Sequence, residues 1–421
     1  MKLQRGLRVA VAATAGVGVL VLGTASAGAR SDTAKAPSAT TAVSGDIVLA
    51  HWSSSPVETQ LLKQVVQSFE RKYPRIHVTR RALDPYPDSM LAQFAARKPP
   101  DVFYVDSNVA PDWIKQGVLQ DLSPYIKQYK FRTKPFYPRL LSAFQSNGKT
   151  YGFPKDWSPL GMQTNTAMLQ RAGVRAPQSW AQLTTTAQRL GSTMPSGTKP
   201  ICLGPDWARA LAFVYQNGGS FLNASKTQAT VATPAVRQAI DFYVGLKNRG
   251  LAGTPAELGV GWCGEALGKE KSAIVFEGNW VVPYMTEQFP TVRYANNRMV
   301  RGRQGGNLAF TVSYSIAKDS KNKNAAWTLL TYLTGRQGMQ IWTSKGLALP
   351  SRSDVKPAAG RASFLAQAPV SRAWQFAPGF ARVITVATNE FSAVFEGKQT
   401  VNGMLAKVQV EATAALRRGG R

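Results

Sequence analysis

Short apolar segments alternate with amphipathic helical segments from Asp46 to Asp106, and this alternation constrains the fold more than any other feature of the sequence. Consecutive strand–helix–strand units are typical of α/β proteins with parallel strands. In such proteins ligands bind beyond the carboxyl ends of the strands, so the loops at 51–56 and 106–108 are predicted walls of a site. The predicted strands are Ile47–Ala50, Ile76–Thr79 and Asp101–Asp106, and the predicted helices span 61–69 and Ser89–Ala96.

Later segments continue the α/β pattern. The sequence predicts strands at Ala273–Phe276 and Leu308–Ala317 and a tight turn at Asn147-Gly148. A length of 421 residues favours two or three domains or lobes. Helices are predicted at Lys323–Leu333, Gln337–Thr343 and, with a basic amphipathic pattern, Val401–Arg418.

Residues 1–27 have the three parts of a secretory signal peptide. Basic residues precede an apolar run from Val9 to Leu22, and Ala25–Ala27 supplies the small residues of a cleavage site. Residues 28–45 are rich in Ala, Ser and Thr and are predicted to form a flexible leader. We therefore expect an exported protein, in the periplasm or at the extracellular face of the cell envelope. Because no cysteine follows the apolar run, we expect no lipoprotein anchor.

The composition argues against metal sites and nucleic-acid recognition. The chain has only two histidines and two cysteines, whereas a zinc site normally takes three or four such ligands or carboxylates, so we expect neither metal nor cofactor. Lys and Arg number 51 against 23 Asp and Glu, which gives a formal charge of +28. The basic residues are spread along the chain and no nucleic-acid-binding motif is present, which favours a diffuse basic surface without a nucleic-acid partner.

Cys202 and Cys263 can pair only with each other within the chain. In an oxidising compartment we expect them to form a disulfide, which would stabilise the fold by about 4 kcal/mol. The alternative is two buried thiols.

Catalytic motifs are incomplete or missing. Gly148-Lys149-Thr150 lacks the first glycine of a phosphate-binding loop, and Ser315–Lys318 lacks the companion elements of penicillin-recognising enzymes. Asp101 and Asp106 stand at opposite ends and on opposite faces of one predicted strand, so they cannot serve as a glycosidase pair. These absences argue against an enzyme.

Tryptophans in predicted loops indicate a different kind of site. Aromatic planes beside carboxylates suit a sugar, whose C–H faces stack on rings while its hydroxyls donate to Asp or Glu. For any single tryptophan, core packing is an equally good interpretation, but the set favours a carbohydrate site. Its members are Trp52, Trp157, Trp207, Trp262 and Trp280.

In this setting the chain resembles the extracellular solute-binding proteins of ABC importers, in the sugar-binding group that includes maltose- and trehalose-binding proteins. The likeness runs from about 46 to 415, and it rests on the shared order and spacing of several short segments. They include the first strand with its Trp-bearing loop, Ser68–Val78, Pro100–Asp106, Gly148–Pro154, Asn217–Gly219, Phe276–Trp280, Ala326–Gly335 and Ala348–Arg352.

The resemblance implies a type II periplasmic-binding-protein fold, in which two α/β lobes, each a mainly parallel sheet flanked by helices, close on a ligand between them. Lobe 1 would comprise 46–154 and 303–345, and lobe 2 would comprise 155–302 and 346–421. The implied function is binding of an oligosaccharide or polyol by a non-enzymatic monomer that delivers it to membrane permease subunits of an ABC importer.

The resemblance also assigns ligand-binding residues. Asp106 matches a carboxylate that accepts hydrogen bonds from sugar hydroxyls, Asp156 follows the first crossover, and Trp280 matches a stacking aromatic. The other expected contacts are Trp52, Ser53 and Glu58 in the first loop, Trp157 at the crossover, and Trp207, Trp262, Asn307 and Tyr314, with Trp374 as a further candidate.

Two alternatives stay open. One is an anionic ligand, such as a sugar phosphate or sugar acid, which Arg or Lys residues facing the cleft would favour. The other is a secreted glycan-processing enzyme, which would require two carboxylates about 5–10 Å apart, one of them with a raised pKa.

Overall fold

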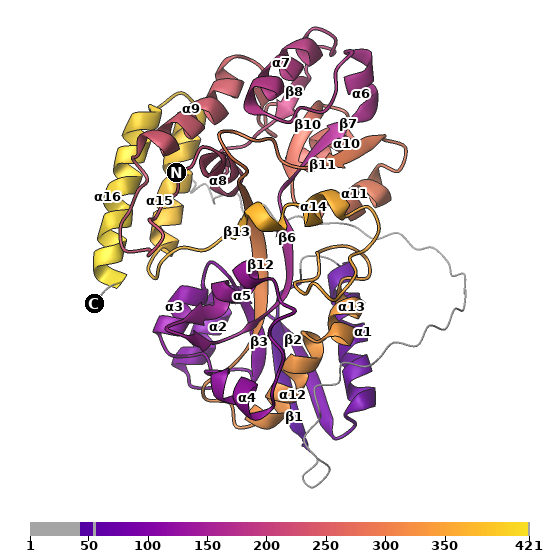
Figure 1. The fold of residues 1–421 in the computed structure, drawn as a ribbon, viewed down its shortest axis with the longest axis vertical. Coiled ribbons are helices and arrows are strands. Elements are labelled where there is room, and N and C mark those ends of the chain that lie inside the picture. The colour runs from indigo at the N-terminus through magenta and orange to yellow at the C-terminus, as the bar shows by residue number, and fades with distance from the viewer. Residues whose placement is uncertain (1–42, 54–55, 420–421) are drawn as a thin grey trace, which may run out of the picture.

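The computed structural model describes residues 43–53 and 56–419, so the predicted signal peptide and most of the predicted leader lie outside the described residues. The described chain forms two α/β lobes, one above the other in Figure 1. The predicted two-lobe α/β fold is therefore confirmed. No helix in the described ranges is both long and apolar enough to span a membrane.

The sheet of lobe 1 follows the predicted strand–helix alternation. Its β1, β2 and β3 are parallel, while β12 runs antiparallel to β3 and β6. The apolar residues that predicted α1, from Leu61 to Phe69, are all buried, and this helix ends just before Pro74. The bounds are β1 (Gly45–His51), α1 (Pro56–Lys72), β2 (Ile76–Ala82), α2 (Tyr86–Ala95), β3 (Val102–Asp106), β6 (Phe153–Pro159), β12 (Asn307–Ile316) and β13 (Ser371–Ala373).

Helices from two distant parts of the sequence cover this sheet. The α12 and α13 helices pack on α1, and their apolar faces join a core that draws on residues 47–153 and 314–355. Asn147 and Gly148 have φ values of 49° and 73° in a two-residue hairpin, which confirms the predicted turn. The bounds are α3 (Ala110–Lys115), α4 (Ser123–Gln128), α5 (Pro138–Leu141), η1 (Ser142–Phe144), β4 (Gln145–Ser146), β5 (Lys149–Thr150), α12 (Lys323–Leu333) and α13 (Arg336–Trp342).

Lobe 2 has a mixed sheet in the order β11-β7-β10-β8-β9. Only β8, β9 and β10 are parallel, whereas β7 is antiparallel to β10 and β11, unlike the mainly parallel sheet that was expected. The direction of β7 is set by β6, because only Leu160 separates the two strands. The bounds are β7 (Gly161–Asn165), β8 (Lys199–Cys202), β9 (Ala252–Gly253), β10 (Ser272–Glu277) and β11 (Tyr294–Asn297).

The helices of lobe 2 enclose the largest core, which combines residues 160–300 with residues 376–415. The C-terminal pair α15 and α16 packs on α9, at the left of Figure 1. The bounds are α6 (Thr166–Arg171), α7 (Trp180–Gly191), α8 (Trp207–Gln216), α9 (Pro234–Asn248), α10 (Cys263–Gly268), α11 (Val281–Gln288), α14 (Ala362–Leu365), η2 (Ala368–Val370), α15 (Ala381–Phe395) and α16 (Val401–Gly419).

A disulfide joins Cys202, at the end of β8, to Cys263, at the start of α10. The predicted pairing is confirmed, and the alternative of two buried thiols is excluded.

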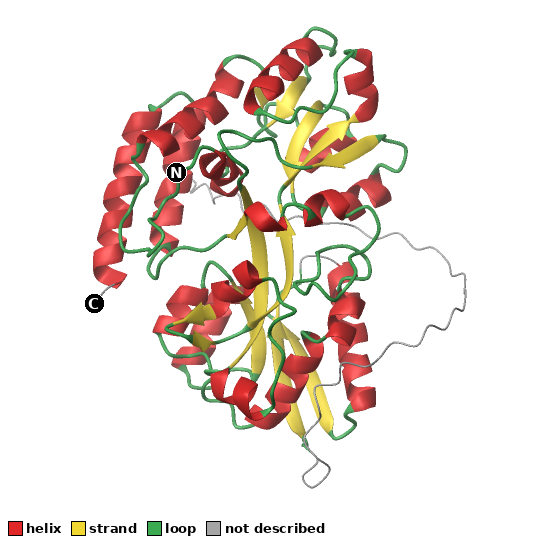
Figure 2. Ribbon diagram, viewed as in Figure 1, coloured by secondary structure: helices red, strands yellow, loops and turns green. Residues whose placement is uncertain are grey.

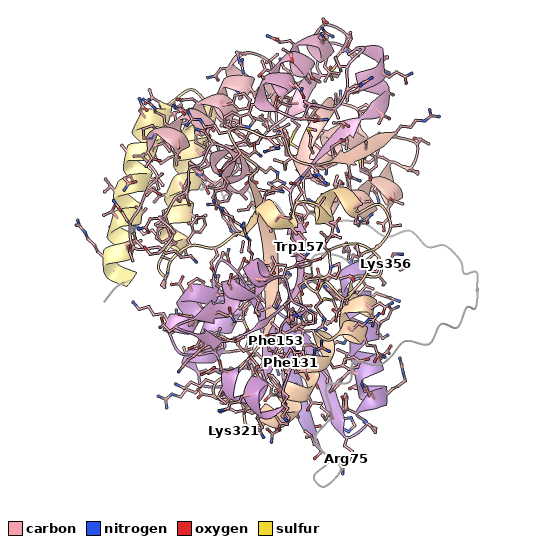
Figure 3. The ribbon with its side chains drawn as sticks, viewed as in Figure 1. Arg75, Phe131, Phe153, Trp157, Lys321 and Lys356 are labelled. Atoms are coloured by element: carbon pink, nitrogen blue, oxygen red, sulfur yellow. A yellow bond between two sulfur atoms is a disulfide. The ribbon has the colours of Figure 1, made fainter. Side chains whose placement is uncertain are left out.

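The lobes are connected by strands that run from one to the other. Figure 2 shows long strands passing through the middle of the molecule, and these are the antiparallel pair β6 and β12. A third segment lies beside β6, where Trp157 and Leu349 exchange backbone hydrogen bonds of 3.1 and 2.8 Å. In Figure 3 Trp157 lies between the lobes, while Phe153 and Phe131 lie within lobe 1 with ring centroids 4.8 Å apart.

Candidate functional site

Asp106 ends β3 at the edge of the lobe 1 sheet that faces lobe 2 (Figure 1). Its Oδ1 accepts hydrogen bonds from the Asn108 backbone N–H at 3.1 Å and from the Ser107 hydroxyl at 3.5 Å. Burial nevertheless raises the pKa of this half-buried carboxyl group to about 6. Within the described part of the chain no cation forms an ion pair with Asp106, so ligand hydroxyls are suitable donors to its remaining acceptor sites.

Glu58 and Asp156 belong to a buried cluster around Lys155, which we call the Lys155 cluster. Lys155 Nζ lies 2.6 Å from Asp156 Oδ2 and 3.9 Å from Glu58 Oε1. The indole N–H of Trp342 donates to Asp156 Oδ2 at 2.7 Å, and Lys155 Nζ lies 4.0 Å from the centroid of the Trp342 ring. Two of the predicted ligand carboxylates are therefore engaged by groups of the protein itself.

Trp52, Ser53 and Tyr314 lie around the same side of lobe 1. The Trp52 ring packs edge-on against Tyr86 and Tyr104, with centroid distances of 4.8 and 4.9 Å. Ser53 Oγ lies 2.5 Å from the hydroxyl oxygen of Thr59. Tyr314 is buried, with its ring 5.3 Å from that of Tyr104. Lys155 Nζ stands 4.7 Å from the Tyr104 centroid, so these side chains adjoin the Lys155 cluster.

Trp280 lies in lobe 2, directly before α11 and half-buried. Its indole N–H donates to Glu277 Oε2 at 3.1 Å, and its ring is 5.5 Å from Phe310 on β12. Glu277 also forms an ion pair with Arg209 of α8, and Arg209 forms a second with Asp206. These interactions hold the Trp280 ring beside a strand that joins the lobes.

Burial and mutual attraction shift the pKa values of the charged groups next to Trp280. Burial raises the pKa of Glu277, while the nearby Arg209 opposes that shift. Burial disfavours the charge of Arg209, but Glu277 and Asp206 outweigh this effect and raise the pKa of the guanidinium. Sequence reasoning missed Arg209 and Phe310, because an arginine within an apolar helix and a phenylalanine within a strand carry no binding signal of their own.

The remaining predicted residues lie elsewhere. Trp157 and Trp207 were expected in loops, which is wrong: Trp157 is in β6 and Trp207 begins α8. Trp157 is buried and donates to the Pro350 carbonyl at 3.0 Å, and Trp207 packs in the lobe 2 core on Phe221 and Phe391. Polar neighbours suggested loops, but Lys155 and Asp156 neutralise each other, and Asp206 caps α8.

Trp262, Asn307 and Trp374 have protein contacts of their own. Trp262 packs on Tyr284, with centroids 4.8 Å apart, beside the disulfide. Asn307 is buried and donates to the Leu160 carbonyl at 2.7 Å. Trp374 is half-buried against Phe376, and its carbonyl accepts a bond of 2.9 Å from the Ser107 hydroxyl, next to Asp106.

A cavity of about 700 Å³ lies between the lobes, and none of the predicted site residues lines it. Its walls come from three places: the α5–η1 segment of lobe 1, the β13 segment, and the end of α8 with the loop that follows. Gly218 and Gly219, which belong to one of the family-like segments, line it. The residues that line the cavity include Arg139, Ala143, Tyr215, Ser220, Phe221, Asn223, Lys226, Thr230, Thr233, Ala235, Arg372, Gln375 and Phe376.

The cavity lining contains three cations and neither aspartate nor glutamate. Arg372 lies over the ring of Tyr215, with its guanidinium carbon 4.6 Å from the centroid. Lys226 Nζ donates to Gln375 Oε1 at 2.7 Å, and the Gln375 amide donates to the carbonyl of Ala143 in lobe 1. Partial burial lowers the pKa of Lys226. Within the described ranges no cluster of His, Cys, Asp and Glu could hold a metal ion.

These features are those of a two-lobed binding protein, and the sequence matches a known family of such proteins. The model of the family described as "Bacterial extracellular solute-binding protein" matches residues 53–340. The chain belongs to this family.

Known proteins support the assignment at the level of fold. A putative binding protein of Brucella abortus is 22% identical over 90% of this chain and 95% of its own length. The sugar-binding protein MalE of Xanthomonas citri has a TM-score of 0.79 at 19% identity, covering 89% of this chain and 98% of that one. UgpB of Mycobacterium tuberculosis, in complex with glycerophosphocholine, has a TM-score of 0.77 at 19% identity, covering 90% and 100%.

Proposed function

We propose that this protein binds a carbohydrate or polyol between its lobes and delivers it to the permease of an ABC importer. The observation that supports the proposal is that Trp280 of lobe 2 and Asp106 of lobe 1 both lie next to β12. The Trp280 ring packs edge-on against Phe310, and Asp106 pairs in register with Val312, two residues further along the strand. Two strand residues span about 7 Å along β12, and we propose that one ligand between the lobes contacts both the indole and the carboxylate.

The chemistry of these two groups suits a hydroxylated ligand. The indole offers an apolar plane that adds on the order of 1 kcal/mol beyond the area it buries. A charged carboxylate adds about 1.5–3 kcal/mol for each good hydrogen bond from a hydroxyl group. Closure of the lobes strengthens binding only if the ligand contacts the closed form better than the open one.

The proposed role leaves the ligand chemically unchanged. Asp106 has the raised pKa of a general acid, but glycoside hydrolysis needs a second, free carboxylate. Asp156, whose charge acts on Asp106, is bonded to Lys155 and Trp342, and Glu58 lies beside the same lysine. These interactions favour binding over catalysis.

The test begins with a thermal-shift screen of sugars and polyols, in which a ligand at 100 times its Kd adds about 2.7 kcal/mol to stability. Calorimetry then compares Trp280→Ala and Asp106→Ala with the unmodified protein. We expect each variant to weaken binding at least about tenfold, with unfolding temperatures that stay close to that of the parent.

Trp180→Ala is the matched control, because it removes another half-buried indole of lobe 2, one that stacks on Phe242 and was not predicted to contact the ligand. We expect it to retain the affinity of the parent. Unchanged affinity in both site variants would disprove the proposed binding site.

A further inference from the structure

We propose that the cavity between the lobes binds an anionic group of the ligand, so that the natural ligand is a phosphorylated or carboxylated sugar or polyol. This inference rests on the proposed function and narrows its ligand class. The argument uses the charges of the cavity, the helix that opens onto it, and the residues at its walls.

The cations of the cavity come from both sides of the gap. Arg139 is in α5 of lobe 1, Lys226 lies in the loop after α8, and Arg372 is in β13. None of the three forms an ion pair with a carboxylate in the part of the chain that the structure describes. By contrast, Arg209 and Arg352 each form an ion pair with a carboxylate. Three unpaired cations around one cavity therefore attract a negative group.

The start of α9 adds to this positive potential. Thr233, which directly precedes this helix of 15 residues, and Ala235, in its first turn, line the cavity. No side chain caps its first turn, because the Thr233 hydroxyl donates instead to the Thr230 carbonyl at 3.0 Å. An uncapped helix N-terminus presents free N–H groups and a partial positive charge, which favour an anion.

The cavity walls position the charges and leave room for a polyol. The Tyr215 ring holds the Arg372 guanidinium at 4.6 Å, and Phe221 and Phe376 add apolar surface. Ser220 supplies a polar group for a ligand hydroxyl, while the Asn223 amide is hydrogen-bonded within its own turn. The acceptor of Lys226 is the neutral amide of Gln375, and an anion is the stronger partner for an ammonium group. Binding would therefore exchange a neutral acceptor for a charged one.

The experiment uses calorimetry on the whole exported protein with glucose, glucose 6-phosphate, glucuronate, glycerol 3-phosphate and inorganic phosphate. We expect at least one phosphorylated or carboxylated polyol to bind at least about tenfold more tightly than its neutral counterpart. Arg372→Gln should remove that preference and leave the affinity for the neutral sugar within about twofold. Comparing phosphates with glucuronate identifies which anionic group is recognised.

Arg189→Gln is the matched control, since Arg189 is exposed on α7, outside the cavity. This variant loses one positive charge, as Arg372→Gln does. It should keep the preference for the anion. The inference is overturned if neutral sugars bind as tightly as their anionic counterparts, or if both arginine variants lose affinity equally. If no member of either class binds or shifts the unfolding temperature, the proposed function fails as well.

Discussion

Two regions near the gap between the lobes use their cations in opposite ways. In the Lys155 cluster the lysine is buried, and Asp156 and Glu58 lie within 4 Å of it. In the cavity Arg139, Lys226 and Arg372 are exposed and no carboxylate is in the lining. Buried, paired charges hold the crossing strand β6 in place, whereas exposed, unpaired ones remain available to a ligand. The comparison shows that charge near the gap is not by itself a sign of binding.

The largest effect is expected from Lys155→Met. Removing the lysine takes away the cation 2.6 Å from the buried Asp156 carboxylate, which should destabilise the fold by about 3–5 kcal/mol. Urea unfolding measures this change. Lys63→Met, at an exposed position of α1, is the control and should change stability by less than about 0.5 kcal/mol. A loss below 1 kcal/mol in the Lys155 variant would show that the cluster does not hold β6.

Replacing Asp106 is expected to have an intermediate effect on stability, and the size of this effect should depend on pH. Burial raises its pKa from 3.8 to about 6, so the folded state binds the proton more tightly than the unfolded state. Proton binding by Asp106 therefore stabilises the folded state at low pH, and this stabilisation is lost as the pH rises through about 6. Asp106→Asn should therefore be more stable than the parent by about 1–2 kcal/mol at pH 7.5, and the difference should shrink towards pH 4.

Urea unfolding at several pH values tests this prediction. Asp319→Asn, at an exposed position, makes the same change in charge and serves as the control. Equal pH dependence in both variants would contradict the raised pKa of Asp106.

The smallest effect on stability is expected from Arg372→Gln. The exposed guanidinium loses only its contact with the Tyr215 ring, so the free energy of unfolding should fall by less than about 1 kcal/mol. Thermal unfolding without ligand measures it. A loss of stability as large as that of the Lys155 variant would show that Arg372, like Lys155, serves to stabilise the fold.

Much of the fold could be predicted from the sequence, because apolar periodicity reports burial directly. The strand expected at Leu308–Ala317 is β12, within one residue at each end, and the helix expected at Lys323–Leu333 is α12. The β6 strand was missed. Its Lys155-Asp156 pair looks like a loop, and only the folded chain shows that these charges neutralise each other inside the protein.

The site was less accessible to sequence reasoning. Asp106 and Trp280 were predicted through the resemblance. In the structure Asp106 lies beside Val312 of β12, and the Trp280 ring lies beside Phe310 of the same strand. The cations of the cavity lie at 139, 226 and 372, and no local pattern relates positions so far apart. The segment Asn217–Gly219 was the available signal, since two of its residues line the cavity.

The crossing segments also determine how the lobes can move. A single linker would let the lobes swivel about any axis, but β6 is hydrogen-bonded to β12 on one side and to Leu349 on the other. Strands joined side by side form a flat ribbon, which bends readily out of its plane and resists twisting. We therefore expect the crossing strands to guide opening and closing of the lobes along one path, so that the two faces meet in the same alignment.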